Sequence, residues 1–201
     1  AYNVPAALRL RGTLDTAALQ CSLDEIVRRH AILRTRFAQA DEGAVQLVDG
    51  GVVPMRLVDF TSVPETERET VARTFIETEA AEVFDFDVSP PVRFSLLQLG
   101  QADFILVSVL HHLVADGWSM SVLLRELLVL YEAFADGRPS PLSPLPLQYA
   151  DYAIHQRHLF TGDTLSAALA YWQKQMAGAP TALDLPLDRP RPAQQSYRGV
   201  L

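Results

Sequence analysis

The sequence predicts an α/β (α+β) sandwich in which helices flank a central β-sheet, and three observations support this prediction. Residues 104–110 form a nearly continuous apolar run, which is typical of a strand covered on both faces. Residues 92–99 precede that run across a short turn at Gly100, which indicates a β-hairpin. Apolar residues at helical spacing over residues 15–30 and 118–135 indicate amphipathic helices that would cover the sheet.

The N-terminal part of the chain is predicted to hold an extended segment followed by a helix. Residues 4–11 form the extended segment. Leu14 and Asp15 then have the character of a hydrophobic staple and an N-cap, so we expect a helix from there to about His30. Its predicted apolar face consists of Leu19, Leu23, Ile26 and Val27.

Three short strands are predicted next. Apolar and polar side chains alternate over residues 32–37, which favours a strand with one buried face. Two further strands are expected over residues 44–48 and 52–60, with the pair Gly50-Gly51 as the turn between them. The sequence therefore predicts that these last two strands are neighbours.

Two further helices flank the predicted hairpin. The first opens at residues 61–64 and carries acidic side chains in its first turns, where the helix dipole favours anions: Glu65, Glu67 and Glu69. Its apolar face is expected to be Val71, Phe75, Ile76 and Val83. The second spans residues 118–135, with a core stripe of Val122, Leu123, Leu127, Leu130 and Phe134.

The C-terminal part of the chain alternates between proline-rich and helical segments. Four prolines in residues 138–146 exclude regular structure there, and helices are expected over residues 148–160 and 165–176. The chain is proline-rich again from residue 178. This tail is either a disordered terminus or a crossover, and we predict a lobe over residues 1–177 with a crossover over 178–201.

Composition excludes several classes of function. The 201-residue chain has a net charge of −7 and no basic stripe, which disfavours nucleic-acid binding. No apolar run approaches the roughly 20 residues that span a bilayer, so we expect no membrane association. The single cysteine, Cys21, excludes an internal disulfide and is expected to be passive. With no secretory signal visible, a cytoplasmic location is predicted.

The segment from His111 to Gly117 carries the clearest chemical signal in the sequence. It follows a buried strand, and strand ends in open sheets are where reactive side chains reach a cleft. A neutral imidazole can accept a proton near neutral pH, and neighbouring histidines point to opposite faces, so at most one is expected to face a substrate. Asp116 could shape the loop or orient a ring, and Gly117 suits a sharp turn into the next helix.

Two other interpretations of this segment are open. A lone His-x-x-x-Asp is more often a satisfied core histidine with a helix cap, although the doubled histidine and the strand–loop–helix context argue against that here. A metal site would need further ligands beside the loop. The remaining histidines lack a ligand-like spacing to it, so no metal is expected: His30, His155 and His158.

Four segments, in order along the chain, resemble motifs of the condensation domains of nonribosomal peptide synthetases. Residues 111–117, HHLVADG, resemble H-H-x-x-x-D-G, and residues 29–37, RHAILRTRF, resemble R-H-x-x-L-R-T-x-F with alanine at a position that is often glutamate. Residues 149–153, YADYA, are similar to Y-x-D-(F/Y)-A. Residues 185–192, LPLDRPRP, resemble the segment that leads into the second lobe of that family.

The resemblance implies a chloramphenicol-acetyltransferase-like lobe with a central mixed β-sheet flanked by helices. Two such lobes form a V with the active site in a tunnel between them, and the C-terminal lobe is absent from this chain. It also implies an acyltransferase-type reaction, peptide bond formation between acyl or peptidyl and aminoacyl thioesters in antibiotic biosynthesis and secondary metabolism. No cofactor would be bound directly, because phosphopantetheine arms carry the substrates. The implied partners are donor and acceptor peptidyl carrier proteins and an adjacent adenylation domain.

The resemblance also implies a role for each site residue. His112 is the catalytic residue, as a base or by positioning the amine and stabilising the tetrahedral intermediate, and Gly117 places a backbone amide near the reacting carbonyl. The expected supporting residues are His111, Asp116 in a salt bridge with Arg34 (Arg29 as second choice), and Trp118. Trp118 is expected to pack in the loop and Ser119 to cap the helix. Tyr149 and Asp151 are expected to pack against and cap theirs.

Related functions differ in features that can be checked. Cyclisation domains replace the histidine pair, which excludes them here. Epimerisation domains share the motif, but the residues flanking it resemble condensation domains more closely, and coenzyme A-dependent acyltransferases would differ in the second lobe. A non-catalytic recruitment module typically alters the histidine pair, which this chain keeps. The chain by itself is expected to have little or no condensation activity, because it would form half of the tunnel.

Overall fold

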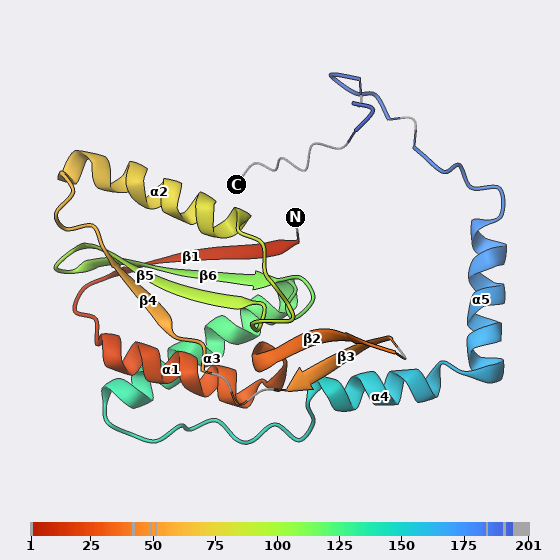
Figure 1. Ribbon diagram of the computed structural model, residues 1–201, viewed down its shortest axis with the longest axis horizontal. Coiled ribbons are helices and arrows are strands. Elements are labelled where there is room, and N and C mark those ends of the chain that lie inside the picture. Colours follow the sequence, from red (N-terminus) through yellow and green to blue (C-terminus); the bar gives the residue numbers. More distant parts are fainter. Residues whose placement is uncertain are drawn as a thin grey trace. The chain divides into compact units, whose positions relative to one another are not determined.

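The computed structural model describes residues 2–41, 43–48, 50, 52–183, 185–190 and 192–194 (Figure 1). Its chain divides into two compact units, residues 1–150 and 151–201. All of the strands found in the described residues belong to the first unit, which also contains the loop that carries the histidine pair.

A four-stranded mixed sheet forms the centre of the first unit. The strands lie in the order β1 (Asn3–Arg11), β6 (Asp103–His111), β5 (Val92–Gly100) and β4 (Met55–Asp59). β1 and β5 both pair with β6 in antiparallel orientation, and β4 pairs with β5 in parallel. The predicted hairpin is therefore confirmed, and its second strand lies between two neighbours.

Helices cover both faces of this sheet. α1 (Thr16–Arg29) and α3 (Gly117–Ala135) lie on one side of it and α2 (Glu65–Ala81) on the other (Figure 1). Along β6, Leu106 packs in the cluster with α1 and α3, whereas Val107 packs in the cluster with α2. The side chains alternate because strand residues have a period of two. The apolar run of the sequence is thus a strand buried on both faces, as predicted.

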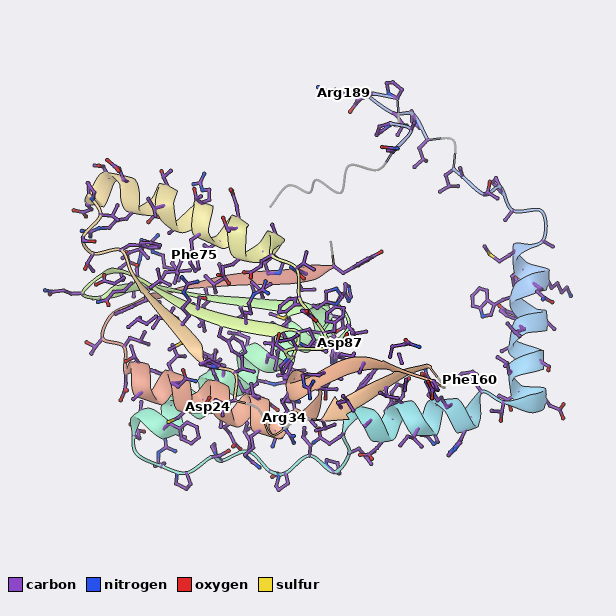
Figure 2. The ribbon with its side chains drawn as sticks, in the orientation of Figure 1. Asp24, Arg34, Phe75, Asp87, Phe160 and Arg189 are labelled. Atoms are coloured by element: carbon purple, nitrogen blue, oxygen red, sulfur yellow. The ribbon has the colours of Figure 1, made fainter. Side chains whose placement is uncertain are left out.

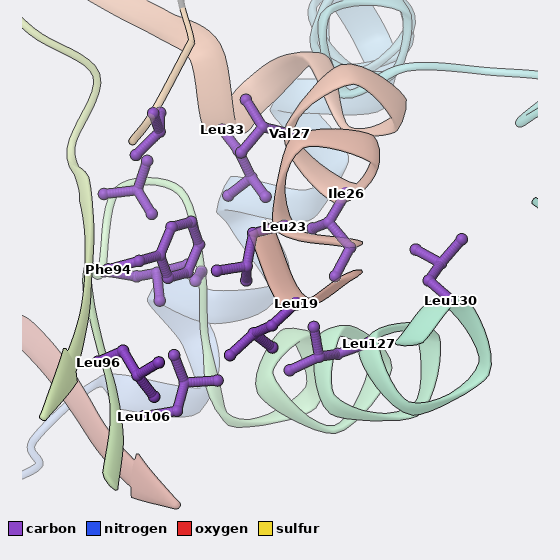
Figure 3. Packing of buried hydrophobic residues seen from close by; sticks show 14 of the residues in the cluster. Leu19, Leu23, Ile26, Val27, Leu33, Phe94, Leu96, Leu106, Leu127 and Leu130 are labelled. Carbon is purple, nitrogen blue, oxygen red and sulfur yellow. The ribbon is translucent and has the colours of Figure 1, made fainter. Parts of the chain in front are cut away.

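The larger cluster, between the sheet and the helices α1 and α3, is built from branched and aromatic side chains (Figure 3). The predicted helix faces contribute directly, with Leu23 of α1 and Leu130 of α3 almost fully buried. Burial of one such side chain contributes about 1.5–3 kcal/mol. α1 begins where predicted, because the Asp15 carboxylate accepts from the amides of Ala17 and Ala18 at 3.0 and 2.9 Å.

Three expected details of the fold are wrong. Residues 31–34 form a 3₁₀ turn, η1 (Ala31–Arg34), because the amide of Leu33 donates to the His30 carbonyl; the strand β2 (Thr35–Ala40) starts only afterwards. β3 (Gly43–Val48) pairs with β2 in a separate two-stranded sheet, and is not a neighbour of β4. α2 ends at Ala81, which leaves Val83 82% exposed beyond the helix.

The C-terminal segments agree with the predicted pattern of helices. Residues 138–146 contain no helix or strand. α4 (Tyr149–Leu159) begins at the last two residues of the first unit, and α5 (Gly162–Met176) follows in the second. The described residues after Met176 have no regular structure, and the predicted lobe boundary at residue 177 stays a prediction. None of the described helices is long and apolar enough to cross a membrane.

Candidate active site

The candidate site is the loop that connects the central strand β6 to the helix α3. β6 ends at His111, whose amide donates to the Pro91 carbonyl at 3.0 Å, and α3 begins at Gly117. The amide of Val114 donates to the His111 carbonyl at 3.0 Å, which closes a tight turn directly after the strand. A rigid strand and a rigid helix therefore hold the two ends of a five-residue loop.

His111 is enclosed by aromatic rings. Its ring makes edge contacts with Phe86, Tyr2 and Phe84 at centroid distances of 4.8, 6.3 and 6.4 Å. Its Nδ1 atom accepts from the amide of Leu113 at 3.1 Å, so that nitrogen carries no proton in this arrangement. Burial, with a smaller contribution from the neighbouring His112, lowers the pKa of His111. This histidine is thus held neutral and fixed within the loop.

His112 is in a different environment from its neighbour. Its residue is exposed, and its backbone amide donates to the Tyr2 carbonyl at 2.7 Å, which extends the contact between β1 and the end of β6. The backbone of His112 is therefore fixed while its imidazole remains accessible. This difference follows the expectation that two adjacent histidines at a strand end face different surroundings.

Asp116 is the N-cap of α3 and is not held by either arginine considered from the sequence. Its Oδ1 atom accepts from both the amide and the hydroxyl of Ser119, at 2.8 and 2.7 Å. These bonds lower the pKa of Asp116, the hydroxyl having the larger effect. The sequence led us to expect Ser119 as the cap and Arg34 or Arg29 as the partner of Asp116. The structure instead has an exposed carboxylate that is satisfied within its own helix turn.

The two arginines lie elsewhere. Arg34 ends η1 and lines a groove with Cys21 and Asp24 on the outer side of α1 (Figure 2), and none of the described residues in that groove belongs to the 111–117 loop. Arg29 forms an ion pair with Glu126 of α3, with Nε and Oε1 3.2 Å apart. Cys21 is an exposed free thiol.

Glu126 is a site neighbour that sequence reasoning missed. Besides Arg29, its carboxylate contacts Nε2 of His30 at 2.7 Å, and all three side chains are less than one fifth exposed. Arg29 also donates to the Ser143 carbonyl, which ties the proline-rich segment to α1. A usable signal was present in the sequence, because Glu126 is the one acidic residue within the predicted core stripe of α3.

Gly117 is not needed for the turn. It does not adopt a positive φ, and a Cβ atom placed on it would meet no heavy atom within 4 Å. We expected a conformation closed to other residues, but Gly117 is an ordinary first residue of α3 with open space beside it. Its amide is one of the N-terminal N–H groups that have no acceptor within a helix.

The remaining predicted residues have simple surroundings. Trp118 is 82% exposed, so it does not pack in the loop as we expected; it lines the rim of a small pocket of about 160 Å³ beside His30 and Val114. Tyr149 and Asp151 lie in the first turn of α4, and their expected roles stay predictions. Within the described part of the chain, no three His, Cys, Asp or Glu residues form a group that could hold a metal ion.

The family model described as "Condensation domain" matches residues 1–200. The linear gramicidin synthase of Brevibacillus parabrevis contains a protein that is 44% identical over 201 residues, which cover 100% of this chain and 3% of that protein. Phosphinothricin tripeptide synthetase PhsB of Streptomyces viridochromogenes is 39% identical over 199 residues, 98% of this chain and 17% of that protein. The chain thus spans a small fraction of these curated relatives.

Solved structures share the fold. The X-domain from teicoplanin biosynthesis has a TM-score of 0.83 and 34% identity, over 98% of this chain and 43% of that one. The starter condensation domain of rhizomide synthetase RzmA has a TM-score of 0.81 at 17% identity, over 89% and 43% of the two chains, and is evidence of the fold alone. The predicted lobe, a mixed sheet flanked by helices, is confirmed.

Proposed function

This chain belongs to the condensation-domain family of nonribosomal peptide synthetases, and we propose that it is the half of such a domain that carries the catalytic histidine. The reaction is amide formation between a carrier-bound acyl or peptidyl thioester and a carrier-bound aminoacyl thioester. The observation that carries the proposal is the exposed imidazole of His112 on a backbone fixed at the end of a buried strand. Such a side chain is accessible to a substrate and is positioned by a rigid scaffold.

His112 acts on the attacking amine. The amine nitrogen forms a bond to the thioester carbonyl carbon, the carbon–sulfur bond breaks, and the amine loses a proton while the departing thiolate gains one. An accessible neutral imidazole can take the proton from nitrogen and return it to sulfur. The other role open to it is to orient the amine and stabilise the tetrahedral intermediate. A positioned histidine contributes about 10²–10⁴-fold to the rate in either proton-transfer step.

Gly117 is proposed to supply a hydrogen-bond donor for the developing oxyanion. Its amide lies at the N-terminus of the 19-residue helix α3, where the helix dipole favours negative charge. The open space beside its Cα lets a thioester carbonyl approach the backbone closely. His111 and Asp116 support the site by fixing the loop, the first through the Leu113 amide and the second through Ser119.

The partners follow from the proposed reaction. Donor and acceptor carrier proteins would bring their phosphopantetheine arms to His112 from opposite ends of a tunnel. A C-terminal lobe of the same domain would complete that tunnel, and an adenylation domain would be adjacent in the parent synthetase. We expect the reaction to take place in the cytoplasm, and the 201-residue chain alone to be inactive.

The decisive experiment uses a complete condensation domain that contains this chain. A loaded donor carrier and an aminoacyl acceptor carrier are mixed with it, and the acceptor is followed by intact-mass spectrometry. We expect the acceptor to gain the donor acyl mass, and His112→Ala to abolish this gain while circular dichroism shows an unchanged fold. No mass gain together with an inverted stereocentre on chiral analysis would instead establish epimerisation.

A recruitment module is the second candidate, because one similar domain was solved together with another protein. The X-domain from teicoplanin biosynthesis, 34% identical to this chain, was also solved as a complex with OxyB from the same biosynthesis. The retained pair His111-His112 favours catalysis in this chain. Product formation that is unchanged by His112→Ala in the parent synthetase would favour recruitment.

A further inference from the structure

Three aromatic rings around His111 form a clamp, Tyr2, Phe84 and Phe86, that the proposed reaction does not use directly. Phe86 is the nearest, with its centroid 4.8 Å from that of the histidine and an interplanar angle of 68°. Phe84 approaches from the same segment at 6.4 Å and is itself buried. The contacts are edge-to-face, the arrangement that aromatic pairs prefer.

The clamp is anchored on two sides. Phe86 accepts from the Phe37 amide of β2 at 3.0 Å through its carbonyl, and the two rings are 6.3 Å apart in a second edge contact. Phe84 lies under the guanidinium of Arg93, 3.9 Å from its ring centroid, a favourable cation–π geometry. Arg93 in turn donates to the carbonyls of Glu79 and Glu82 at 2.9 and 3.0 Å.

The clamp acts on the backbone that presents His112. The His111 ring accepts from the amide of Leu113, and the His111 carbonyl accepts from the amide of Val114. Both bonds lie on the C-terminal side of His112, whose own amide is held by Tyr2. A shift of the His111 ring would therefore release the loop on one side of His112 while the other side stayed fixed.

We infer that Phe86, with Phe84 behind it, is a positioning residue that orients the His112 imidazole by locking the ring of His111. The inference rests on the proposed function of His112. Phe86 touches no reacting atom, so its effect is on turnover and not on substrate affinity. A catalytic group displaced by about 1 Å can lose on the order of 100-fold in rate, which sets the scale of the expected effect.

The first test measures rates in a complete condensation domain containing this chain. Phe86→Leu should lower kcat about 10- to 100-fold and change KM by less than roughly two-fold, whereas Phe86→Tyr, which keeps the ring, should restore kcat to within about three-fold of wild type. Phe75→Leu is the matched control. Phe75 is a half-buried ring paired with Phe60 on the α2 side of the sheet (Figure 2), and its loss should lower stability but leave kcat unchanged.

The second test observes His111 directly in the 201-residue chain with ¹³C-labelled histidine, and needs no reaction. Phe86→Leu should move the His111 ring signal and raise the pH at which it titrates, whereas Phe75→Leu should leave it in place. The ionisable groups on the elements around the ring are His112, Tyr2, Asp85, Asp87 and Arg93. These five remain unchanged in both variants.

Three outcomes overturn the inference. An unmoved His111 signal in Phe86→Leu shows that the clamp does not hold the ring, whatever the reaction is. A wild-type kcat in Phe86→Leu, or an equal loss in Phe75→Leu, shows that the rings act on stability alone. If His112→Ala retains full activity in the same domain, the proposed function fails, and the histidine signals still decide whether Phe86 fixes His111.

Discussion

Helix α3 carries two histidine–carboxylate neighbourhoods that look alike in the sequence and differ in structure. At its N-terminus, His112 and Asp116 are both exposed, and the carboxylate is satisfied by Ser119. In its middle, Glu126 is buried against His30 at 2.7 Å and Arg29 at 3.2 Å. By distance alone, the second would be taken for the catalytic pair. The comparison shows that a short His–acid contact can serve stability, while the histidine available for chemistry is the accessible one.

The sharpest test of this comparison exchanges the two histidines in turn. His112→Ala should lower amide formation in the complete domain by about 10²–10⁴-fold and leave unfolding unchanged. His30→Ala should do the reverse, costing about 1.5–3 kcal/mol of stability with kcat retained, because a hydrogen bond to a buried charge is lost. Carrier-loading assays and urea unfolding measure the two effects. Equal losses of activity in both variants would contradict the division.

Removal of the central carboxylate should have the largest effect on folding. Glu126→Ala leaves the Arg29 guanidinium, whose side chain is 9% exposed, without its ion pair, so we expect a loss of about 3–5 kcal/mol in the free energy of unfolding. Glu126→Gln keeps the shape and some hydrogen bonding, and should lose less. Denaturant titration of the 201-residue chain decides. A loss below about 1 kcal/mol would mean that solvent screens this cluster as it screens surface pairs.

Loss of the carboxylate at the N-terminus of α3 should cost less. Asp116→Ala removes the N-cap and should destabilise the chain by about 1 kcal/mol, whereas Asp116→Asn should retain most of the stability because asparagine also caps well. Unfolding curves of the two variants provide the measurement. If Arg34→Ala were as costly as Asp116→Ala and not additive with it, the salt bridge expected from the sequence would be restored as the explanation.

The pH dependence of stability should report the clamp around His111. Its pKa is lowered from 6.5 by burial, so the unfolded chain binds the proton more readily than the folded chain does. The contribution of this residue to stability is fully present above pH 6.5 and is lost as the pH falls from there toward the lowered value. His111→Asn should flatten the difference between urea unfolding at about pH 7.5 and at lower pH by less than about 1 kcal/mol. An unchanged slope would show that burial does not disfavour the charged ring.

The smallest expected effect on stability belongs to Gly117. Because it has helical φ and open space for a Cβ atom, Gly117→Ala should be neutral or stabilising by about 0.4–1 kcal/mol. The same methyl group would occupy the space proposed for the thioester carbonyl, so turnover in the complete domain should fall. A destabilised variant would indicate that the glycine is required by the turn after all.

Much of the fold follows from local patterns that a sequence expresses directly. The hairpin of β5 and β6 and the cap at Asp15 depend on neighbours within a few residues, so periodicity and side-chain type suffice. The error over residues 32–37 has a local cause as well. Alternation over six residues does not distinguish a strand from a 3₁₀ turn that buries Ala31 and Leu33 before β2 begins.

The candidate site can be found in the sequence through its loop, whereas its supports cannot. The strand–loop–helix order around His112 is legible because it is contiguous in the chain. Arg29 and Glu126 are 97 residues apart, and nothing in either neighbourhood specifies the other. The same holds for the clamp, in which Phe86 and His111 meet only because β5, β6 and the segment before β5 are brought together.

The sequence by itself determined the elements along residues 92–135, the buried central strand and the position of the histidine pair at its end. The tertiary structure alone decided that β3 pairs with β2 and that β4 joins the larger sheet. It also decided that Asp116 caps its own helix while Glu126 takes the arginine. The physical reason is that hydrogen bonds and side-chain periodicity act within a few residues, whereas ion pairs and aromatic contacts depend on which distant segments the hydrophobic core holds side by side.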